Sequence, residues 1–420
     1  MIKIVNTKNK NYLFNINKII SKRRITRRSN NIIVKKILND VKKNKTKALI
    51  NYEKKFGQNS KIKPNSSEIN DSIKKLNPKV KSAIDFAYRR ILNFHNKQKL
   101  KNIKYLDKYK NLLEYKNVPI NSVGIYVPAN LPSSLLMNAI PAKIAKVKKI
   151  ILANPRVNGK LNPAVMYAAK KLGIKEIYSM GGAQAIASLC YIQKVDKIVG
   201  PGNKFVTEAK ISLFGEIGVE SMIAGPSEIC VVADKNTNIN EISSSLIGQA
   251  EHDKNSQSIL ITKEKSIIKK VINEINNLLK KLPKKSIALA SLKKNGLIIY
   301  VNKENKIPPI INLISPEHLE LNIKKPNKYL KKITNCGSIC IGKYSAMALS
   351  DYSVGTNHVL PTFGSAKFSS GLNVGEFYKK ISQIKLSKKG IEVIGRHAIN
   401  LAEYENLHGH VESIKSRMRR

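Results

Sequence analysis

Short apolar runs alternate with helical segments through the middle of the chain, and this alternation constrains the fold more than any other feature of the sequence. Four β-rich runs begin between residues 122 and 196, and small residues, Pro or Gly follow each of them: SVGIYV, KKIILA, IKEIYS and DKIVG. Segments with helical character separate the first three runs. Strand–helix–strand alternation at this spacing is typical of parallel βαβ units. We therefore expect an α/β layer at about residues 123–227.

A second α/β layer is expected further along the chain. Its apolar runs are EICVVAD, SQSILIT, GLIIYV and GSICIG, and helices are predicted at 239–252 and 265–282. The first quarter shows helical spacing over 30–58 and 78–100, and the tail from Val374 is predicted to be helical again. The 420 residues exceed the roughly 250–300 at which one hydrophobic core stops growing, so the chain should form more than one domain.

The composition narrows the functional classes. The net charge of +48 is typical of a nucleic-acid-binding protein. The excess, however, is mostly Lys spread from Lys3 to Lys415, densest at 22–28, while aromatic residues are only 6% and Trp is absent. This pattern favours a solvated Lys-rich surface over nucleic-acid binding. The absence of any long uninterrupted apolar stretch argues against a membrane span, and four Cys indicate a reduced, cytoplasmic protein.

Three loops rich in small residues precede or follow predicted strands. MGGAQAIASL and GPGNKFVTEAK each follow a strand and open a helix, whereas AGPSEICVVAD leads into a strand. Glycines at such positions let the backbone approach a ligand, and helix-start N–H groups attract phosphate. Neither of the first two loops has the GxGxxG spacing, so ordinary turn glycines remain the alternative to a dinucleotide site.

Polar residues with catalytic or metal-binding chemistry concentrate in the second half. Six of the seven His lie between residues 252 and 410. Gln249 and His252 are three residues apart, so they share one helical face, and the adjacent Glu317 and His318 suit acid–base work. Asp351 lies in a Gly- and Pro-bearing segment predicted to be a loop. These residues predict a metal or acid–base site. Cys336 and Cys340 are further candidate ligands, although buried hydrophobic packing is the favoured interpretation.

Taken in order, these motifs resemble those of the histidinol dehydrogenase family. The resemblance runs from about residue 20 to the C-terminus and rests on GGAQAIA, VGPGNKFVTEAK, AGPSEI, QAEHD, PEHLEL, DYSVGTNHVLPT, SSGL and YENLHGH. It implies a zinc- and NAD-dependent homodimer that oxidises L-histidinol through L-histidinaldehyde to L-histidine. It also implies an α/β fold of two incomplete Rossmann-like domains in an intertwined dimer. We expect an N-terminal arm at 1–22, a larger domain at 23–122 plus 228–373, a smaller NAD-contacting domain at 123–227 and a helical C-terminal arm at 374–420, exchanged between subunits.

The resemblance also assigns roles residue by residue. One zinc per subunit would be held by Gln249, His252, Asp351 and His410, with His410 supplied by the partner subunit. The acid–base pair would be Glu317 and His318. Substrate contacts would come from Ser227, Gln249, His252, His318, Asp351, His358, Glu405 and His410, and NAD contacts from Tyr126, Gln184 and Asn203. Two imidazole nitrogens and two oxygens, one from an amide and one from a carboxylate, suit a borderline-soft divalent ion such as zinc.

Two other functions remain open at this point. A zinc hydrolase could use the same four ligands, but it would have no need of the GGAQA and GPGN loops. A basic binding protein could also keep the enzyme's fold without turnover. The chain departs from the family pattern in two shortened loops, one after Pro128 and one near Tyr191, and both flank the inferred cofactor cleft.

Overall fold

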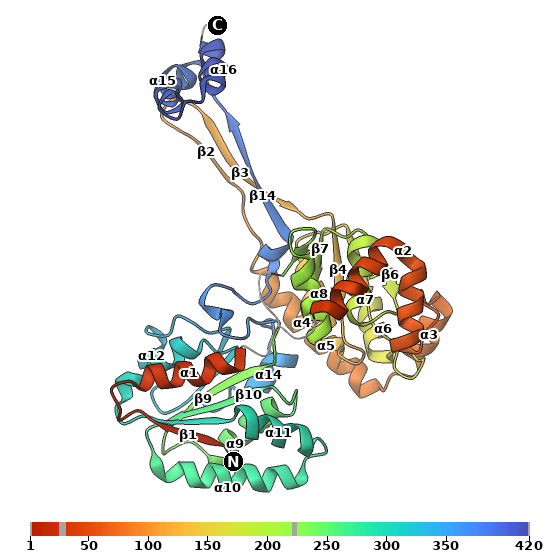
Figure 1. The fold of residues 1–420 in the computed structure, drawn as a ribbon, viewed down its shortest axis with the longest axis vertical. Coiled ribbons are helices and arrows are strands. Elements are labelled where there is room, and N and C mark those ends of the chain that lie inside the picture. Colours follow the sequence, from red (N-terminus) through yellow and green to blue (C-terminus); the bar gives the residue numbers. More distant parts are fainter. Residues whose placement is uncertain (1, 25–30, 221–224, 419–420) are drawn as a thin grey trace.

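Two parallel sheets and one long antiparallel arm make up the molecule (Figure 1). The computed structural model describes residues 2–24, 31–220 and 225–418. Strand-to-strand pairing is parallel throughout both sheets. The α/β class with parallel sheets, expected from the alternation of strands and helices, is therefore confirmed.

The five-stranded sheet has the order β6-β5-β4-β7-β8. Its strands are β4 (Ser122–Tyr126), β5 (Lys149–Ala153), β6 (Glu176–Tyr178), β7 (Lys197–Val199) and β8 (Gly218–Val219). The connecting helices are α5 (Pro132–Ile144), α6 (Pro163–Lys171), α7 (Gly182–Tyr191) and α8 (Lys204–Leu213). Neighbouring residues of β5 enter different cores, since Leu152 belongs to one and Ile151 to the other. Helices therefore cover both faces, as a parallel sheet requires.

Three helices from the first quarter of the chain also pack on this sheet. They are α2 (Asn31–Gly57), α3 (Ser66–Lys74) and α4 (Pro78–Asn96). Helix α2 lies against α7, α3 against α6, and α4 against α5. The boundaries expected from the sequence assign 23–122 to the larger domain, whereas residues 31–96 pack on the smaller sheet. Helical periodicity identifies the apolar face of a helix but not the surface that this face will cover.

The six-stranded sheet has the order β1-β11-β10-β9-β12-β13. Its strands are β1 (Lys3–Asn6), β9 (Glu228–Ala233), β10 (Gln257–Thr262), β11 (Leu297–Tyr300), β12 (His318–Asn322) and β13 (Ser338–Ile341). Its helices are α9 (Ile239–Ala250), α10 (Lys265–Lys281), α11 (Lys285–Asn295), α12 (Ile307–Ile314), α13 (Asn327–Leu330) and α14 (Met347–Tyr352). The predicted helices at 239–252 and 265–282 thus agree with α9 and α10 to within two residues.

The first residues of the chain belong to this second sheet. Strand β1 pairs in parallel with β11, and α1 (Tyr12–Arg24) places Ile16 and Ile20 in the core beneath the sheet. The segment 1–22, expected as an arm, is therefore part of the domain wherever it is described. Strand β12 was not predicted from the sequence. Its five residues form a strand by pairing with β9 and β13, and this pairing is not visible in the local sequence pattern.

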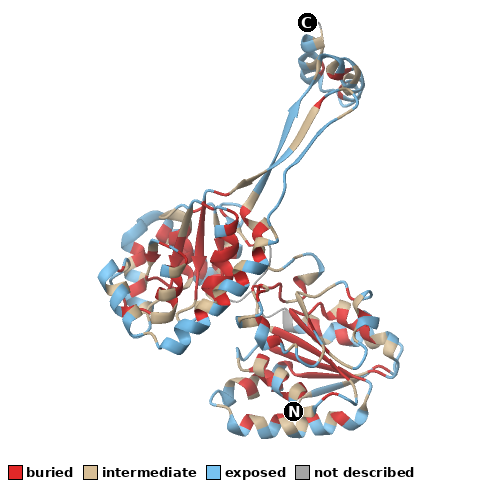
Figure 2. Ribbon diagram, turned by 180° about the vertical axis from the view of Figure 1, so that it is seen from behind, coloured by how far each residue is buried: buried red, intermediate tan, exposed pale blue. Residues whose placement is uncertain are grey.

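The arm consists of β2 (Ile103–Leu106), β3 (Leu112–Pro119) and β14 (Tyr378–Lys385), and it carries α15 (Lys388–Tyr404) and α16 (His408–Met418) at its far end. It projects away from both sheets, and most of its surface is exposed (Figures 1 and 2). The helical tail predicted from Val374 therefore begins with a short 3₁₀ turn and a strand. Both faces of β14 are mostly exposed, so its sequence lacks the alternation that marks a half-buried strand.

Two expectations from the sequence concern a membrane span and the basic cluster at 22–28. No helix among the described residues is long and apolar enough to cross a membrane. The basic cluster at 22–28 lies mostly outside the described residues, so the structure says nothing of most of its side chains.

A buried ion pair fastens α8 to the strand that follows it. Lys210 Nζ lies 2.5 Å from Glu220 Oε1 and also donates to the carbonyl oxygen of Gly200. The two charged residues are 3% and 5% exposed. Removing one partner of such a pair leaves the other charge buried and unpaired, which is costly. The pair thus links the GPGN loop to the edge of the smaller sheet.

We predict that Lys210→Met lowers the thermal midpoint far more than Lys42→Met does. The first change should cost about 3 kcal/mol or more, because Glu220 loses its buried partner. The exposed pair of Lys42 and Glu216 should contribute less than about 1 kcal/mol. Differential scanning fluorimetry of both variants measures the difference. Equal shifts for the two would show that the buried pair does not stabilise the domain.

Candidate active site

The two sheets with their helices, without the arm, form the body of the molecule. The expected catalytic and metal-binding residues of the body meet at the amino edge of the six-stranded sheet. Ser227 directly precedes β9, and Glu317 directly precedes β12. Helix α9 leaves the carboxyl end of β9 and runs back, so Gln249 in its last turn returns to the amino edge. Asp351 lies on α14, which packs against both α9 and β12. The expectation that Asp351 lies in a loop is therefore wrong, since a short helix carries it.

The two residues expected to form the acid–base pair are buried beside Asp351. Glu317 and His318 are 6% and 3% exposed. His318 Nε2 lies 3.9 Å from Glu317 Oε1 and 3.7 Å from Asp351 Oδ1. The Glu228 amide donates to Glu317 Oε2 at 2.8 Å, which fixes that carboxyl group. An imidazole between two carboxyl groups can exchange a proton with a substrate that enters beside it.

Burial sets the protonation state of this pair. It raises the pKa of Glu317 well above the usual range, and the nearby carboxylates of Glu228 and Asp351 act in the same direction. Burial, with His358 and His252 nearby, lowers the pKa of His318 to about 3. The His318 imidazole is therefore neutral at physiological pH, which is the form that accepts a proton.

The body offers three donors to a metal ion. Gln249 is 1% exposed, and its Oε1 is a buried atom with no hydrogen-bond partner in the described structure. His252 lies just beyond the end of α9, and burial raises the pKa of Asp351 to about 7. A buried amide oxygen without a partner requires an explanation, and a metal ion would supply one. The residues present therefore fit a metal.

The structure does not bring the fourth expected ligand to this place within one chain. His410 lies on α16 and Glu405 at the end of α15, both exposed at the tip of the arm (Figure 1). Among the described residues, no group of three or more His, Cys, Asp or Glu side chains could hold a metal ion. Cys336 and Cys340 are free thiols, and burial raises their pKa values to about 11 and about 12, so both are protonated.

His358 joins the site to the smaller domain. Its Nδ1 donates to the carbonyl oxygen of Asp351 at 2.6 Å, so this tautomer leaves Nε2 without a proton. Nε2 lies 3.4 Å from Ser134 Oγ, at the start of α5. Burial lowers the pKa of His358 to about 4. The carboxyl edge of the smaller sheet therefore faces the amino edge of the larger one across this contact.

The expected NAD contacts lie along the carboxyl edge of the smaller sheet. Tyr126 ends β4, Gln184 is in the first turn of α7, and Asn203 caps α8. Gly182 N lies 3.4 Å from Tyr126 Oη, which accepts its hydrogen bond. Gly200 has φ +114, and a Cβ there would come within 2.0 Å of the Tyr126 carbonyl oxygen, so only glycine fits. Open α/β sheets usually bind ligands at this edge.

The Asn203 side chain occupies part of the helix start that the sequence offers to phosphate. Its Oδ1 accepts from the amides of Phe205 at 3.0 Å and Val206 at 3.2 Å. Asn203 is exposed, and its Nδ2 group takes no part in these two hydrogen bonds. A cofactor would therefore meet an amide side chain at the start of α8.

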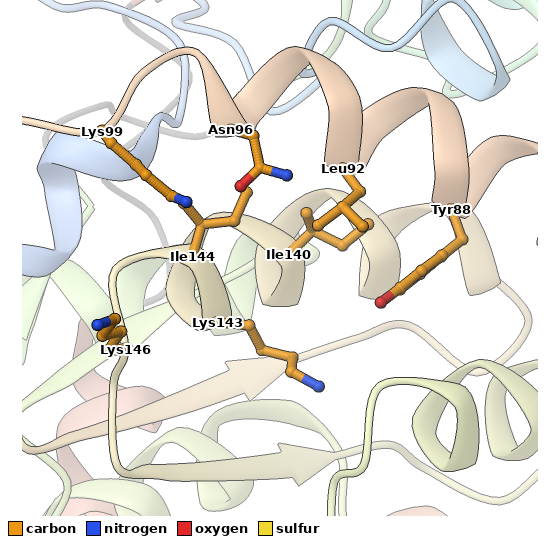
Figure 3. Close-up of a pocket in the computed structure, with 8 residues that line it drawn as sticks. All are labelled: Tyr88, Leu92, Asn96, Lys99, Ile140, Lys143, Ile144 and Lys146. Atoms are coloured by element: carbon orange, nitrogen blue, oxygen red, sulfur yellow. The ribbon is translucent and has the colours of Figure 1, made fainter.

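The described surface also contains a hollow of about 280 Å³ between α4 and α5 (Figure 3). Apolar side chains such as Leu92 and Ile140 line it together with three lysines. It contains none of the expected site residues.

A buried network holds the loop of His358 from the side of α4. His95 is 0% exposed, and its Nδ1 donates to Gln98 Oε1 at 2.7 Å. Its Nε2 then accepts from Asn357 Nδ2 at 3.4 Å, and Asn357 also donates to the Met137 carbonyl oxygen. Only a neutral imidazole can donate at one nitrogen and accept at the other. Burial lowers the pKa of His95, which keeps it neutral.

Sequence reasoning missed several residues that shape the site. His95 is the one His outside the cluster at 252–410, and Glu228 is part of the quoted AGPSEI motif without an assigned role. Ser134 and Glu53 also contact site residues. Only Glu53 could have been noticed in the sequence, because it is one of two acidic residues in the Lys-rich helix α2.

Comparisons with known proteins agree with this geometry. A sequence model described as histidinol dehydrogenase matches residues 21–418. The chain is 56% identical to the histidinol dehydrogenase of Pelagibacter ubique, over all of both chains. It is 42% identical to histidinol dehydrogenase 1 of Trichormus variabilis, over 92% of this chain and 91% of the relative. The crystal structure of histidinol dehydrogenase from Elizabethkingia anophelis superimposes with a TM-score of 0.92 at 35% identity, covering 100% of this chain and 98% of that chain.

We predict that the thermal midpoint of His95→Gln falls less than that of wild type when the pH is lowered. The folded pKa of His95 lies below the unfolded value of about 6.5, so the unfolded chain binds its proton first as the pH falls. The stability that neutral His95 contributes is present above about pH 6.5 and is lost as the pH falls through its folded pKa. Thermal midpoints of chelator-treated wild type and variant at pH 7.5 and 5.5 measure this. An unchanged drop in the variant would contradict it.

Proposed function

The chain belongs to the histidinol dehydrogenase family, and from that premise we propose how its own residues divide the work of the reaction. It is an NAD-dependent oxidoreductase of histidine biosynthesis. Family membership replaces the two alternatives left open by the sequence, a zinc hydrolase and a basic nucleic-acid-binding protein. The proposal concerns the finer points: the residues, the metal stoichiometry and the dimer.

The proposed metal site holds one zinc per subunit. Gln249, His252 and Asp351 would bind it from one chain, and His410 of the partner subunit would complete the set. The buried, unpartnered Oε1 of Gln249 supports this assignment. So does Asp351, because a cation beside its carboxyl group would offset the burial that raises its pKa.

The proposed dimer brings the tip of one arm to the active site of the other subunit. Exposed apolar side chains occur at the tip of the arm, where Leu401 and Tyr404 are 64% and 87% exposed. Others flank Asp351 on α14, where Leu349 and Tyr352 are 47% and 59% exposed. Large apolar groups gathered on two separate surfaces favour burial against a partner. An intertwined homodimer with shared sites would cover both surfaces and supply Glu405 and His410.

One observation carries the proposed mechanism: His318 Nε2 lies within 4 Å of the carboxyl groups of both Glu317 and Asp351. When bound, zinc orients the substrate and NAD accepts the hydride in each of the two oxidations. Neutral His318 would take the alcohol proton in the first oxidation. Glu317, in its ionised form, would take a proton from the water that hydrates L-histidinaldehyde before the second, and its raised pKa would make that carboxylate a stronger base.

The remaining site residues would position the two ligands. Ser227 and His358 lie on the body and would contact the substrate together with Glu405. Tyr126, Gln184 and Asn203 line the facing edge of the smaller sheet and would contact NAD. Placement in the cytoplasm remains part of the proposal, supported by the four free cysteines.

Turnover of the zinc-loaded protein tests the proposed function. With L-histidinol and excess NAD, absorbance at 340 nm should show two NADH formed for each L-histidine produced. A reaction without L-histidinol is the control. Failure to form NADH in zinc-replete protein would refute the proposal.

The two acid–base residues should separate the two oxidations. We expect Glu317→Gln to slow the oxidation of L-histidinaldehyde more than that of L-histidinol, because it loses the base that activates water. His318→Gln should slow the alcohol step as well. Stopped-flow measurements with each substrate give both rates. Equal losses in both steps for Glu317→Gln would show that its role is misassigned.

Mixing two inactive variants tests the shared site. His410→Asn and Gln249→Ala protein, unfolded together and refolded, should form about half heterodimers by random pairing. Each heterodimer would have one site with both lesions and one intact site, so activity should recover to roughly a quarter of the wild-type value. Refolded wild type and each variant refolded alone are the controls. A mixture as inactive as its parents would contradict the exchange of the arm.

A further inference from the structure

We propose that Glu53, on α2, is a positioning residue of the cofactor site that fixes the Gln184 side chain for contact with NAD. The inference rests on the proposed contact between Gln184 and NAD. Helix α2 contributes no residue to the expected catalytic, metal or cofactor sets, so this role extends the site into the first quarter of the chain.

The contacts of Glu53 converge on the start of α7. Glu53 is 1% exposed. Its Oε1 accepts from the Gly181 amide at 2.8 Å and from Gln184 Nε2 at 2.9 Å. Gly181 is the N-cap residue of α7, so the carboxylate lies where the helix dipole favours negative charge. Both donors are neutral, and burial raises the pKa of Glu53 while these two hydrogen bonds lower it.

The chain just after α2 holds the same turn from a second side. Asn59 Nδ2 donates to the Ser179 carbonyl oxygen at 2.8 Å, and the Ser179 amide donates to the Ile62 carbonyl oxygen at 2.6 Å. Residues 53–62 therefore fasten both ends of the turn that runs from β6 into α7. This turn also contains Gly182, whose amide lies beside Tyr126 Oη.

These contacts determine which atom Gln184 presents. A side-chain amide can flip, exchanging its oxygen and nitrogen, when nothing distinguishes the two. Because Nε2 donates to Glu53, the flipped form would bring two oxygens together and is disfavoured. Gln184 Oε1 remains for the cofactor, and an amide oxygen accepts from a hydroxyl or amino group. Glu53 would thus fix Gln184 as an acceptor before NAD binds.

The absence of a side chain at Gly57 makes room for this carboxylate. A Cβ on Gly57 would lie 2.5 Å from Glu53 Oε2. Gly57 is the last residue of α2, so its backbone conformation also suits alanine. The added methyl group would clash only with the Glu53 carboxylate. Gly57→Ala therefore displaces Glu53 without removing its charge, which gives an independent perturbation of the same contact.

The test measures the dissociation constant of NADH for the zinc-loaded enzyme by fluorescence titration. Glu53→Leu removes the acceptor at similar size and should weaken NADH binding roughly fivefold to tenfold. Glu53→Gln keeps an oxygen that accepts both hydrogen bonds and should stay within about twofold of wild type. Gly57→Ala should weaken binding in the same direction as Glu53→Leu. Asp40→Leu, which removes the other acidic residue of α2, is the matched control and should change nothing.

Two further readouts separate positioning from a general structural effect. The KM for L-histidinol and the zinc content should be unchanged in Glu53→Leu. In a Gln184→Ala background, the added effect of Glu53→Leu should fall below about twofold, because the group through which it acts is gone. A full effect in that background, or one that raises both KM values alike, would overturn the inference.

The outcome also distinguishes this inference from its premise. If Gln184→Ala weakens NADH binding and neither Glu53→Leu nor Gly57→Ala does, the role of Glu53 is refuted while the NAD contact stands. If Gln184→Ala binds NADH as wild type does, the contact itself is wrong, and the role of Glu53 is refuted with it. Should Glu53→Leu fail to fold, Gly57→Ala carries the same comparison.

Discussion

The parallel pairing of β12 with β9 is the constraint on which the active site depends. Its register places His318 opposite Ile229, so Glu317 lies beside the Glu228 amide that donates to it. From this starting point the return of α9 brings Gln249 to the same edge, and α14 brings Asp351. A slip of one residue in β12 would turn His318 to the other face of the sheet. The placement of Glu317 and His318 at this edge is therefore a consequence of sheet register.

One contact between the two sheets runs through His358. His358 lies between the Asp351 carbonyl oxygen and Ser134 Oγ, and the network of His95 and Asn357 holds its loop from behind. In the proposed mechanism, substrate chemistry at the larger sheet and cofactor contacts at the smaller one would meet across this junction. The buried, neutral state of His95 and His358 keeps the hydrogen bonds at the junction defined.

The sequence predicted those parts of the fold that local patterns encode. β4, β5 and β9 are apolar runs bounded by small residues, and each is a strand in the structure. Long-range packing could not be predicted. The apolar face of α2 is visible in the sequence, but the pattern does not indicate which surface that face covers. β14 was missed because it is exposed on both faces. Glu53 was missed for a related reason: its partners, Gly181 and Gln184, are about 130 residues away along the chain.

The residue types alone predict the kind of chemistry at the site. The role of each residue was predicted only from the family resemblance. Adjacent Glu317 and His318 indicate acid–base chemistry, but their protonation follows from burial that the sequence does not show. The spacing of Gln249 and His252 indicates a shared face, yet no spacing joins them to Asp351 or to His410.

The central claim is that the body of one chain and the arm of another form a single zinc site. The anomalous difference map of a zinc-loaded crystal, measured at the zinc edge, tests it most directly. The account predicts one peak per subunit, bounded by Gln249, His252 and Asp351 of one chain and by His410 of another. A peak bound by His410 of the same chain, or one away from Gln249 and Asp351, would contradict it.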